Sequence, residues 1–172
     1  MNITLDGQEF IIDNPKAKAW RMIAKFETIR KDIPLENYTD FFAEVIVQII
    51  DNPEITVELI LTNIGIENII AFYDKLACWI FSIINKKLSE VPPLPKDPDG
   101  PNTENFTEYE KVVYFYSNIH EGYGWTRRQI DEEDLGYLLD LIIVRAKANC
   151  KDDDKSYIDE ETGERLYYID AL

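Results

Sequence analysis

The residues whose types could support catalysis or metal binding are few in this chain. His120 is the single histidine, so no second histidine is present to complete a zinc-binding pair at helical spacing. A Cys/His nucleophile site could form only if Cys78 or Cys150 folded against His120. Each cysteine lies on an apolar helical pattern, and we interpret both as buried thiols of a reducing cytosol. We therefore expect no catalytic residue, no metal site and no enzymatic activity.

Acidic and glycine-containing stretches also lack the spacing of known ligand-binding motifs. The acidic residues 152–154, with Asp159 and Glu160 beyond them, lack the central glycine and terminal glutamate of an EF-hand loop. Gly122 and Gly124 are not followed by the Lys and Ser or Thr of a phosphate-binding loop. We expect a solvated acidic run, no bound nucleotide and no cofactor.

The charge balance argues against nucleic acid as a partner. The chain has 18 basic and 33 acidic side chains, a net charge of −15, and such a chain repels a phosphate backbone. Residues 125–141 have the outline of a helix-turn-helix in which Arg127 and Arg128 could touch phosphate, but Glu132 and Asp134 would face the DNA. We expect two packed helices there instead.

The apolar content predicts a folded core and no membrane span. Apolar residues make up 45% of the 172 residues, with ten Tyr, eight Phe and three Trp, which is enough for a buried core. No uncharged apolar run approaches about 18 residues, and residues 1–6 lack the basic start of a signal peptide. We expect a cytoplasmic protein that contacts no membrane.

The front of the chain predicts a β-hairpin followed by helices. Asp6-Gly7 suits the positive φ angles of a tight turn between two short β-favouring runs. Pro53 stands where a first helical turn can begin, and Gly65 can end a helix in the left-handed conformation. Apolar residues at helical spacing cover four stretches, at about 15–32, 38–50, 53–64 and 66–88.

A proline-rich stretch separates this part from a second group of helices. Residues 89–105 contain five prolines and one glycine, which is typical of an extended linker; a Pro-rich ligand at residues 92–95 is the alternative. Thr107 with Glu110 matches a capping box. Thr126 with Gln129 matches another, ahead of a long helix at about 132–149.

We therefore predict a mainly α fold in two helical parts. Residues 1–88 form a β-hairpin plus helical domain, 89–105 a linker, 106–150 a second small helical unit, and 151–172 an acidic tail. The tail has eight acidic and three basic residues, a net charge of −5, and few apolar residues. We favour a tail that orders only on contact with a partner; a hairpin about Thr162-Gly163 is the alternative.

The second half of the chain contains a series of short motifs, Phe115-Tyr116, Gly124-Trp125-Thr126, Ile130-Asp131, Asp134-Leu135, Leu138-Leu139 and Tyr168-Ile169-Asp170. In these motifs the chain resembles the tail assembly chaperones of long-tailed, siphovirus-type bacteriophages of Gram-positive hosts. Members of that family often begin with a short β-hairpin around an Asp/Asn-Gly turn and continue as a helical domain. Some append a second helical part by a programmed ribosomal frameshift, and the linker at residues 89–105 stands where such a junction could fall.

The resemblance implies a binding role without catalysis. Such a chaperone coats the tape measure protein in the host bacterial cytoplasm, presents it to tail tube subunits and is absent from the mature virion. Assembly of the chain into rings or spirals is implied as well. The apolar stretches at 41–50 and 66–84 are broader than one small domain must hide, although packing against each other as an ordinary core is the alternative that we favour for most of their residues.

Aromatic residues on the weakly folded parts are the candidate protein-binding residues, because aromatic anchors on flexible segments can dominate binding energy. For Trp125 the alternative is that it fills the gap between the last two helices. The candidates are Tyr123, Trp125, Tyr157, Tyr167 and Tyr168.

A small acidic inhibitor is the competing function. An immunity-type protein or DNA mimic of this kind masks a basic enzyme surface with carboxylates clustered on one rigid face. The densest acidic runs here are at residues 132–134 and in the tail, and the tail is expected to be flexible. We therefore favour the chaperone.

Overall fold

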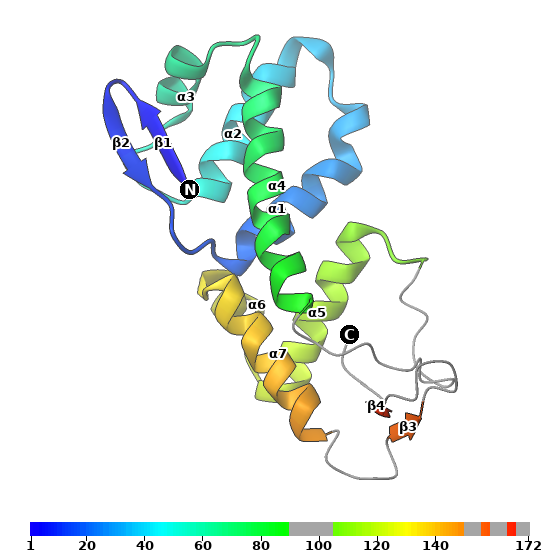
Figure 1. The fold of residues 1–172 in the computed structure, drawn as a ribbon. Coiled ribbons are helices and arrows are strands. Elements are labelled where there is room, and N and C mark those ends of the chain that lie inside the picture. The colour runs from blue at the N-terminus through cyan, green and yellow to red at the C-terminus, as the bar shows by residue number, and fades with distance from the viewer. Residues whose placement is uncertain (90–104, 150–155, 159–164, 168–172) are drawn as a thin grey trace.

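The computed structural model of the chain describes residues 1–89, 105–149, 156–158 and 165–167. The fold is mainly helical with a short N-terminal β-hairpin, as the sequence predicts (Figure 1). In the hairpin, β1 (Asn2–Leu5) pairs antiparallel with β2 (Gln8–Ile11). Asp6 and Gly7 have φ angles of 49° and 73°, the positive values that a tight primed turn needs.

The first helical part contains α1 (Ala17–Ile29), α2 (Tyr38–Ile50), α3 (Val57–Ile64) and α4 (Ile69–Leu88), with the 3-10 turns η1 (Arg30–Asp32) and η2 (Leu35–Asn37) between α1 and α2. The helix expected from Pro53 begins four residues later. Thr56 is its N-cap, and the Thr56 hydroxyl accepts a hydrogen bond from the amide of Leu59, which satisfies a free donor of the first turn.

The broad apolar faces of α2 and α4 mostly form an ordinary core. Phe26, Phe42 and Tyr73 meet edge to face, with ring centroids 4.9 to 5.1 Å apart, a favourable arrangement for aromatic rings. The buried positions of α4 recur at helical spacing. Cys78 lies off that face and is exposed, so the expectation of a buried thiol was wrong for this residue; Cys150 lies outside the described residues.

The second helical part contains α5 (Glu108–Tyr123), α6 (Arg127–Glu132) and α7 (Leu135–Asn149). Both predicted capping boxes are present, at Thr107 and at Thr126. The long helix expected from Glu132 is instead broken at Glu133, whose ψ of 155° is extended. The break is stabilised by Asp134, because its carboxylate accepts a hydrogen bond from the amide of Tyr137 in the first turn of α7.

The break between α6 and α7 joins the two helical parts. The Ala17 amide donates to the Glu133 carbonyl at 2.9 Å, and the Leu135 amide donates to the Pro15 carbonyl at 2.9 Å. The extended backbone beside Asp134 thus pairs with the residues that precede α1, in the manner of a strand. A continuous helix would have used these backbone groups internally.

One hydrophobic core runs through both parts. Trp20 of α1 packs edge to face against Phe115 of α5, with ring centroids 5.2 Å apart, and α4 lies against α7. The second part therefore sits at one end of the first and contacts α1 and the end of α4 (Figure 1). The buried residues of both parts form a single cluster, whose members range from Ile3 to Ile142 in the chain.

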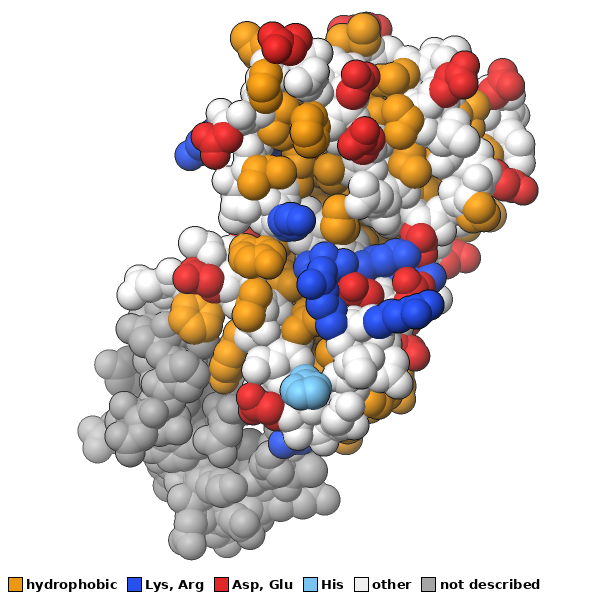
Figure 2. Space-filling model, turned by 180° about the vertical axis from the view of Figure 1, so that it is seen from behind, with side chains coloured by type: hydrophobic (Ala, Val, Ile, Leu, Met, Phe, Trp, Pro, Cys, Tyr) orange, Lys and Arg blue, Asp and Glu red, His pale blue; other side chains and the backbone are white. Residues whose placement is uncertain are grey.

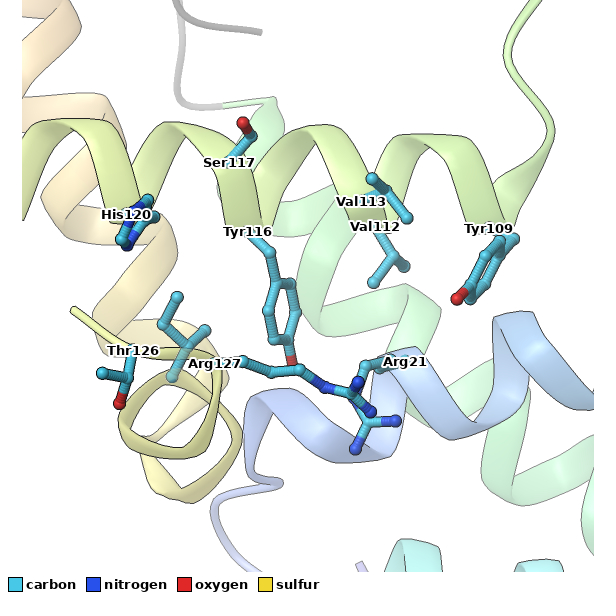
Figure 3. Close-up of a pocket in the computed structure, with 10 residues that line it drawn as sticks. Arg21, Tyr109, Val112, Val113, Tyr116, Ser117, His120, Thr126 and Arg127 are labelled. Atoms are coloured by element: carbon cyan, nitrogen blue, oxygen red, sulfur yellow. The ribbon is translucent and has the colours of Figure 1, made fainter. Parts of the chain in front are cut away.

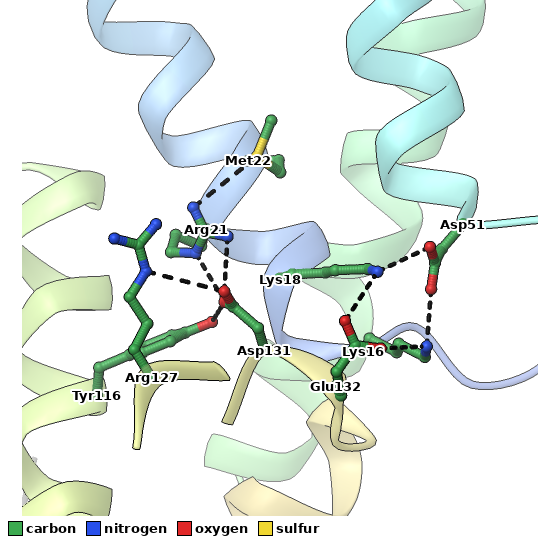
Figure 4. Close-up of polar contacts among 9 residues, drawn as sticks. All are labelled: Lys16, Lys18, Arg21, Met22, Asp51, Tyr116, Arg127, Asp131 and Glu132. Atoms are coloured by element: carbon green, nitrogen blue, oxygen red, sulfur yellow. Dashed lines mark hydrogen bonds and ion pairs between the residues drawn. The ribbon is translucent and has the colours of Figure 1, made fainter. Parts of the chain in front are cut away.

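Charged residues at this junction pair with one another. Lys16 and Lys18 each contact both Asp51 and Glu132, at 2.6 to 3.3 Å (Figure 4). Hydrogen bonds from these lysines lower the pKa of Glu132. Partial burial works to raise the pKa of Asp51, but the same lysines hold it below its usual value. Two positive and two negative charges thus link α1 to the end of α2 and to α6.

Two short strands lie in the C-terminal stretch. β3 (Ser156–Ile158) pairs antiparallel with β4 (Arg165–Tyr167). This pairing is what the hairpin alternative predicts for these residues, and it differs from the favoured loose tail, because the stretch holds β-favouring residues on either side of Thr162-Gly163. The turn itself lies outside the described residues.

None of the helices in the described ranges has the combined length and apolar character needed to cross a bilayer.

Substitution of Trp20 tests how much its packing in the core stabilises the fold. Trp20 is 7% exposed, and its indole Nε1 finds no acceptor among the described residues. Trp20→Ala should lower the free energy of unfolding by about 3 to 5 kcal/mol through the cavity it leaves. Trp20→Phe should cost less than half as much, because it keeps a ring against Phe115 and removes an unsatisfied donor. Urea denaturation measures both variants; equal losses would mean that the indole N–H has a partner in solution.

Candidate functional site

An open groove of about 550 Å³ lies where α5, α6 and α1 meet (Figure 3). Its volume is in the range of pockets that take ligands. Most of the wall comes from α5, with α6 at one end and α1 opposite. The residues that line it are Arg21, Tyr109, Val112, Val113, Tyr116, Ser117, His120, Thr126, Arg127 and Ile130.

The residues of α5 that line the groove recur every three or four positions, from Tyr109 to His120. This spacing places them on one face of the helix. The floor is apolar, because Val112 and Ile130 are 1% exposed and belong to the core. Part of the rim is apolar too, with Tyr109 at 38% and Val113 at 52% exposure. Exposed apolar side chains above a buried apolar floor form a surface that another protein segment can cover.

One wall of the groove is fixed by a hydrogen-bonded cluster of Arg21, Tyr116 and Asp131 (Figure 4). Arg21 binds Asp131 through both ends of the carboxylate, with Nε to Oδ1 at 2.7 Å and Nη2 to Oδ2 at 2.9 Å. The Tyr116 hydroxyl donates to Oδ1 at 2.7 Å. Burial, together with this bond to Asp131, raises the pKa of Tyr116, so the hydroxyl remains a donor at neutral pH. The cluster joins α1, α5 and α6.

Arg127 reaches into the groove from α6 with much of its charge available. Its side chain is 70% exposed, and its Nε is 3.8 Å from Asp131 Oδ2. That distance is beyond hydrogen-bond range. Asp131 already accepts shorter bonds from Arg21 and Tyr116, so its carboxylate serves Arg127 only as a neighbouring charge.

His120 closes one end of the groove and has a structural partner. Its Nδ1 lies 2.8 Å from the carbonyl oxygen of Trp125, which ties the end of α5 to the start of α6. Within the described residues, no three His, Cys, Asp or Glu side chains lie together in a way that could hold a metal ion. The groove offers apolar contact area and positive charge, and the Ser117 hydroxyl in its lining donates a hydrogen bond to the Glu121 carboxylate at 3.1 Å.

The charge of the groove differs from that of the whole chain. Its described lining includes two arginines and no Asp or Glu, although the chain carries a net charge of −15. Figure 2 shows Lys and Arg side chains gathered across the middle of one face, with a few acidic side chains among them. Local positive charge on an acidic protein selects for acidic groups that approach closely, because screening limits longer-range repulsion to about 8 Å at physiological salt.

Of the residues predicted from sequence to bind a partner, Tyr123 and Trp125 have described side chains, and neither lines the groove. The Tyr123 hydroxyl donates to the Leu141 carbonyl at 3.1 Å, and Tyr123 is 37% exposed. Trp125 is partly buried and packs against the core. Tyr157 and Tyr167 fall in β3 and β4, where only the backbone is described, and Tyr168 lies outside the described residues.

The groove residues were missed, although the sequence contains a sign of them. Tyr109, Val113, Tyr116 and His120 form a second helical stripe beside the buried stripe of α5. Arg127 was considered only as a phosphate contact. The part played by Arg21 could not be predicted, because it depends on a residue 110 positions away in the chain.

The Arg21–Asp131 pair generates a stability prediction. Both side chains are about 15% exposed, and removing one partner leaves the other charge partly buried. Asp131→Asn should therefore lower the free energy of unfolding by about 2 kcal/mol or more. Glu132→Gln is the matched control, because it removes the same charge from the next residue, whose ion pairs are exposed and worth less than about 1 kcal/mol. Equal effects of the two variants in urea denaturation would contradict the anchoring role of Asp131.

Comparisons with known proteins add no relative. No protein family model matches the chain, no curated protein matches it, and no solved structure matches it. The function is therefore inferred from the groove and from the resemblance described above.

Proposed function

We propose that this chain is a tail assembly chaperone of a long-tailed bacteriophage, and that it works by binding without catalysis. In this proposal it holds the tape measure protein in the host bacterial cytoplasm and presents it to tail tube subunits. The chaperone then leaves and is absent from the mature virion. The client segment binds in the groove between α1, α5 and α6.

The observation that carries this proposal is the apolar rim of the groove. Val113 is 52% exposed and Tyr109 is 38% exposed on the same side of α5, above a floor of core residues. Tape measure proteins, by the same resemblance, contain long apolar helices that aggregate when they are free. An apolar face of a helix is held well by a hydrophobic groove with charged margins. The acidity of the chain would help to keep such a complex in solution.

The acidic inhibitor finds less support in the described residues. It requires carboxylates that are free to face a basic enzyme. Glu132 is paired with Lys16 and Lys18, and Asp134 accepts the hydrogen bond that begins α7. The densest acidic run of the described residues therefore serves the fold itself.

Co-expression with the tape measure protein encoded nearby in the same genome tests the proposal. We expect the chain to keep the tape measure protein soluble and to elute with it as one complex in size-exclusion chromatography with light scattering. Val113→Asp should reduce the soluble tape measure protein by about tenfold, the loss expected when a central apolar contact is removed.

Val144→Asp is the matched control. Val144 is 64% exposed on α7 and is not among the residues that line the groove. This variant should keep the tape measure protein soluble, and circular dichroism should show that both variants are folded. A tape measure protein that precipitates with the unmodified chain would overturn the proposed function, whereas equal losses in both variants would move the binding site away from the groove.

A further inference from the structure

We infer that the groove takes a helical segment with a carboxylate beside its apolar face, and that Arg127 binds that carboxylate. The groove as a protein-binding site rests on the proposed function. The chemistry of the bound segment rests on charges and contacts within the groove.

The guanidinium of Arg127 is available to bind a ligand. The Arg21 guanidinium donates hydrogen bonds to both oxygens of Asp131, at 2.7 and 2.9 Å, and the Arg21 side chain is 16% exposed. Arg127 has only the 3.8 Å approach to the same carboxylate and is 70% exposed. A guanidinium can bind a carboxylate through two parallel N–H donors. Arg127 is therefore the cation of the groove that can receive a ligand.

The groove carries net positive charge around its two arginines. Arg21 and Arg127 contribute two positive charges, and Asp131 behind them contributes one negative charge, which leaves one positive charge. The described lining contains no carboxylate, but Glu121 lies beside it and accepts a hydrogen bond from the lining residue Ser117 at 3.1 Å, so the positive charge is local to Arg127. The whole chain carries a net charge of −15, so the average surface of this protein attracts an acidic ligand only weakly. Binding of such a ligand is therefore selective for the groove.

The length of the groove along α5 indicates the shape of the ligand. The lining runs along α5 from Tyr109 to His120, which is about 16 Å at 1.5 Å per residue. This length matches about three turns of a second helix packed beside α5. Tyr109 and Val113 present apolar contacts on this stripe, and Arg127 projects from α6 on the opposite side (Figure 3). A helix with an acidic residue at the margin of its apolar face contacts the stripe of α5 with that face and Arg127 with the acidic residue.

A pair of synthetic helical peptides tests the inference with the full chain. Each is about 15 residues long, enough for a marginally stable helix in water, with leucines along one face. One peptide carries Glu at both margins of that face, and the other carries Gln at the same positions. Fluorescence anisotropy measures the Kd of each. We expect the Glu peptide to bind about tenfold more tightly than the Gln peptide, the effect of one charge-assisted contact.

Arg127→Gln should abolish the difference between the peptides by weakening the Glu peptide about tenfold. Arg127→Lys should restore part of it, since charge is kept but the two parallel donors are lost. Arg128→Gln is the matched control, because Arg128 is the next residue of α6, is exposed and lies outside the groove lining. It should leave both Kd values unchanged.

Equal binding of the two peptides, binding of neither, or equal effects of Arg127→Gln and Arg128→Gln would overturn the inference. The outcome is separate from that of the proposed function. If Arg127→Gln loses the Glu peptide but the chain fails to keep the tape measure protein soluble, then the groove binds acidic helices and the client is another protein. If the tape measure protein stays soluble and neither peptide binds, then the chaperone stands and the acidic ligand is wrong.

Discussion

The bidentate contact between Arg21 and Asp131 fastens the second helical part of this protein to the first. Arg21 belongs to α1 and Asp131 to α6, and Tyr116 of α5 donates to the same carboxylate. Around this cluster, the backbone bonds of Ala17 and Leu135 and the packing of Trp20 on Phe115 align the two parts. These polar contacts join the two parts at defined positions, while the shared core supplies most of the stability.

The same cluster explains why the groove is positive and accessible. Because Arg21 and Tyr116 occupy both oxygens of Asp131, Arg127 has no close partner in that carboxylate and projects into the groove. The apolar floor is part of the core that joins the parts. The proposed binding surface is held by contacts from three helices, which would lower the entropic cost of ordering it when a partner binds.

Local signals in the sequence predicted the elements well. The Asp6-Gly7 turn, both capping boxes and the alternating apolar faces are properties of neighbouring residues, and the structure contains them. Glu133 shows where such reasoning ends: helical spacing continued through it, but backbone bonds with residues near Lys16 favour an extended conformation there. Thr56 shows that a side-chain cap can outweigh a nearby proline in setting where a helix begins.

The groove was harder to predict than the elements, because it forms only where α1, α5 and α6 meet. Buried Val112 and exposed Val113 are adjacent in sequence, and both line the groove, one on its floor and one on its rim. This arrangement depends on the packing of α1 and α6 against α5. Tyr123 and Trp125 are predicted as aromatic anchors on weakly folded segments, and in the structure Tyr123 donates to the backbone of α7 and Trp125 packs on the core. Their part in binding a partner stays a prediction.

Hydrogen–deuterium exchange of the chain, alone and with its bound client, locates the surface that the client covers without any substitution. We predict that client binding slows exchange in α5 and α6 and leaves the β1–β2 hairpin, which lies beside α3, unchanged. Protection confined to the hairpin, α2 or α3, with α5 and α6 unaffected, would contradict this prediction.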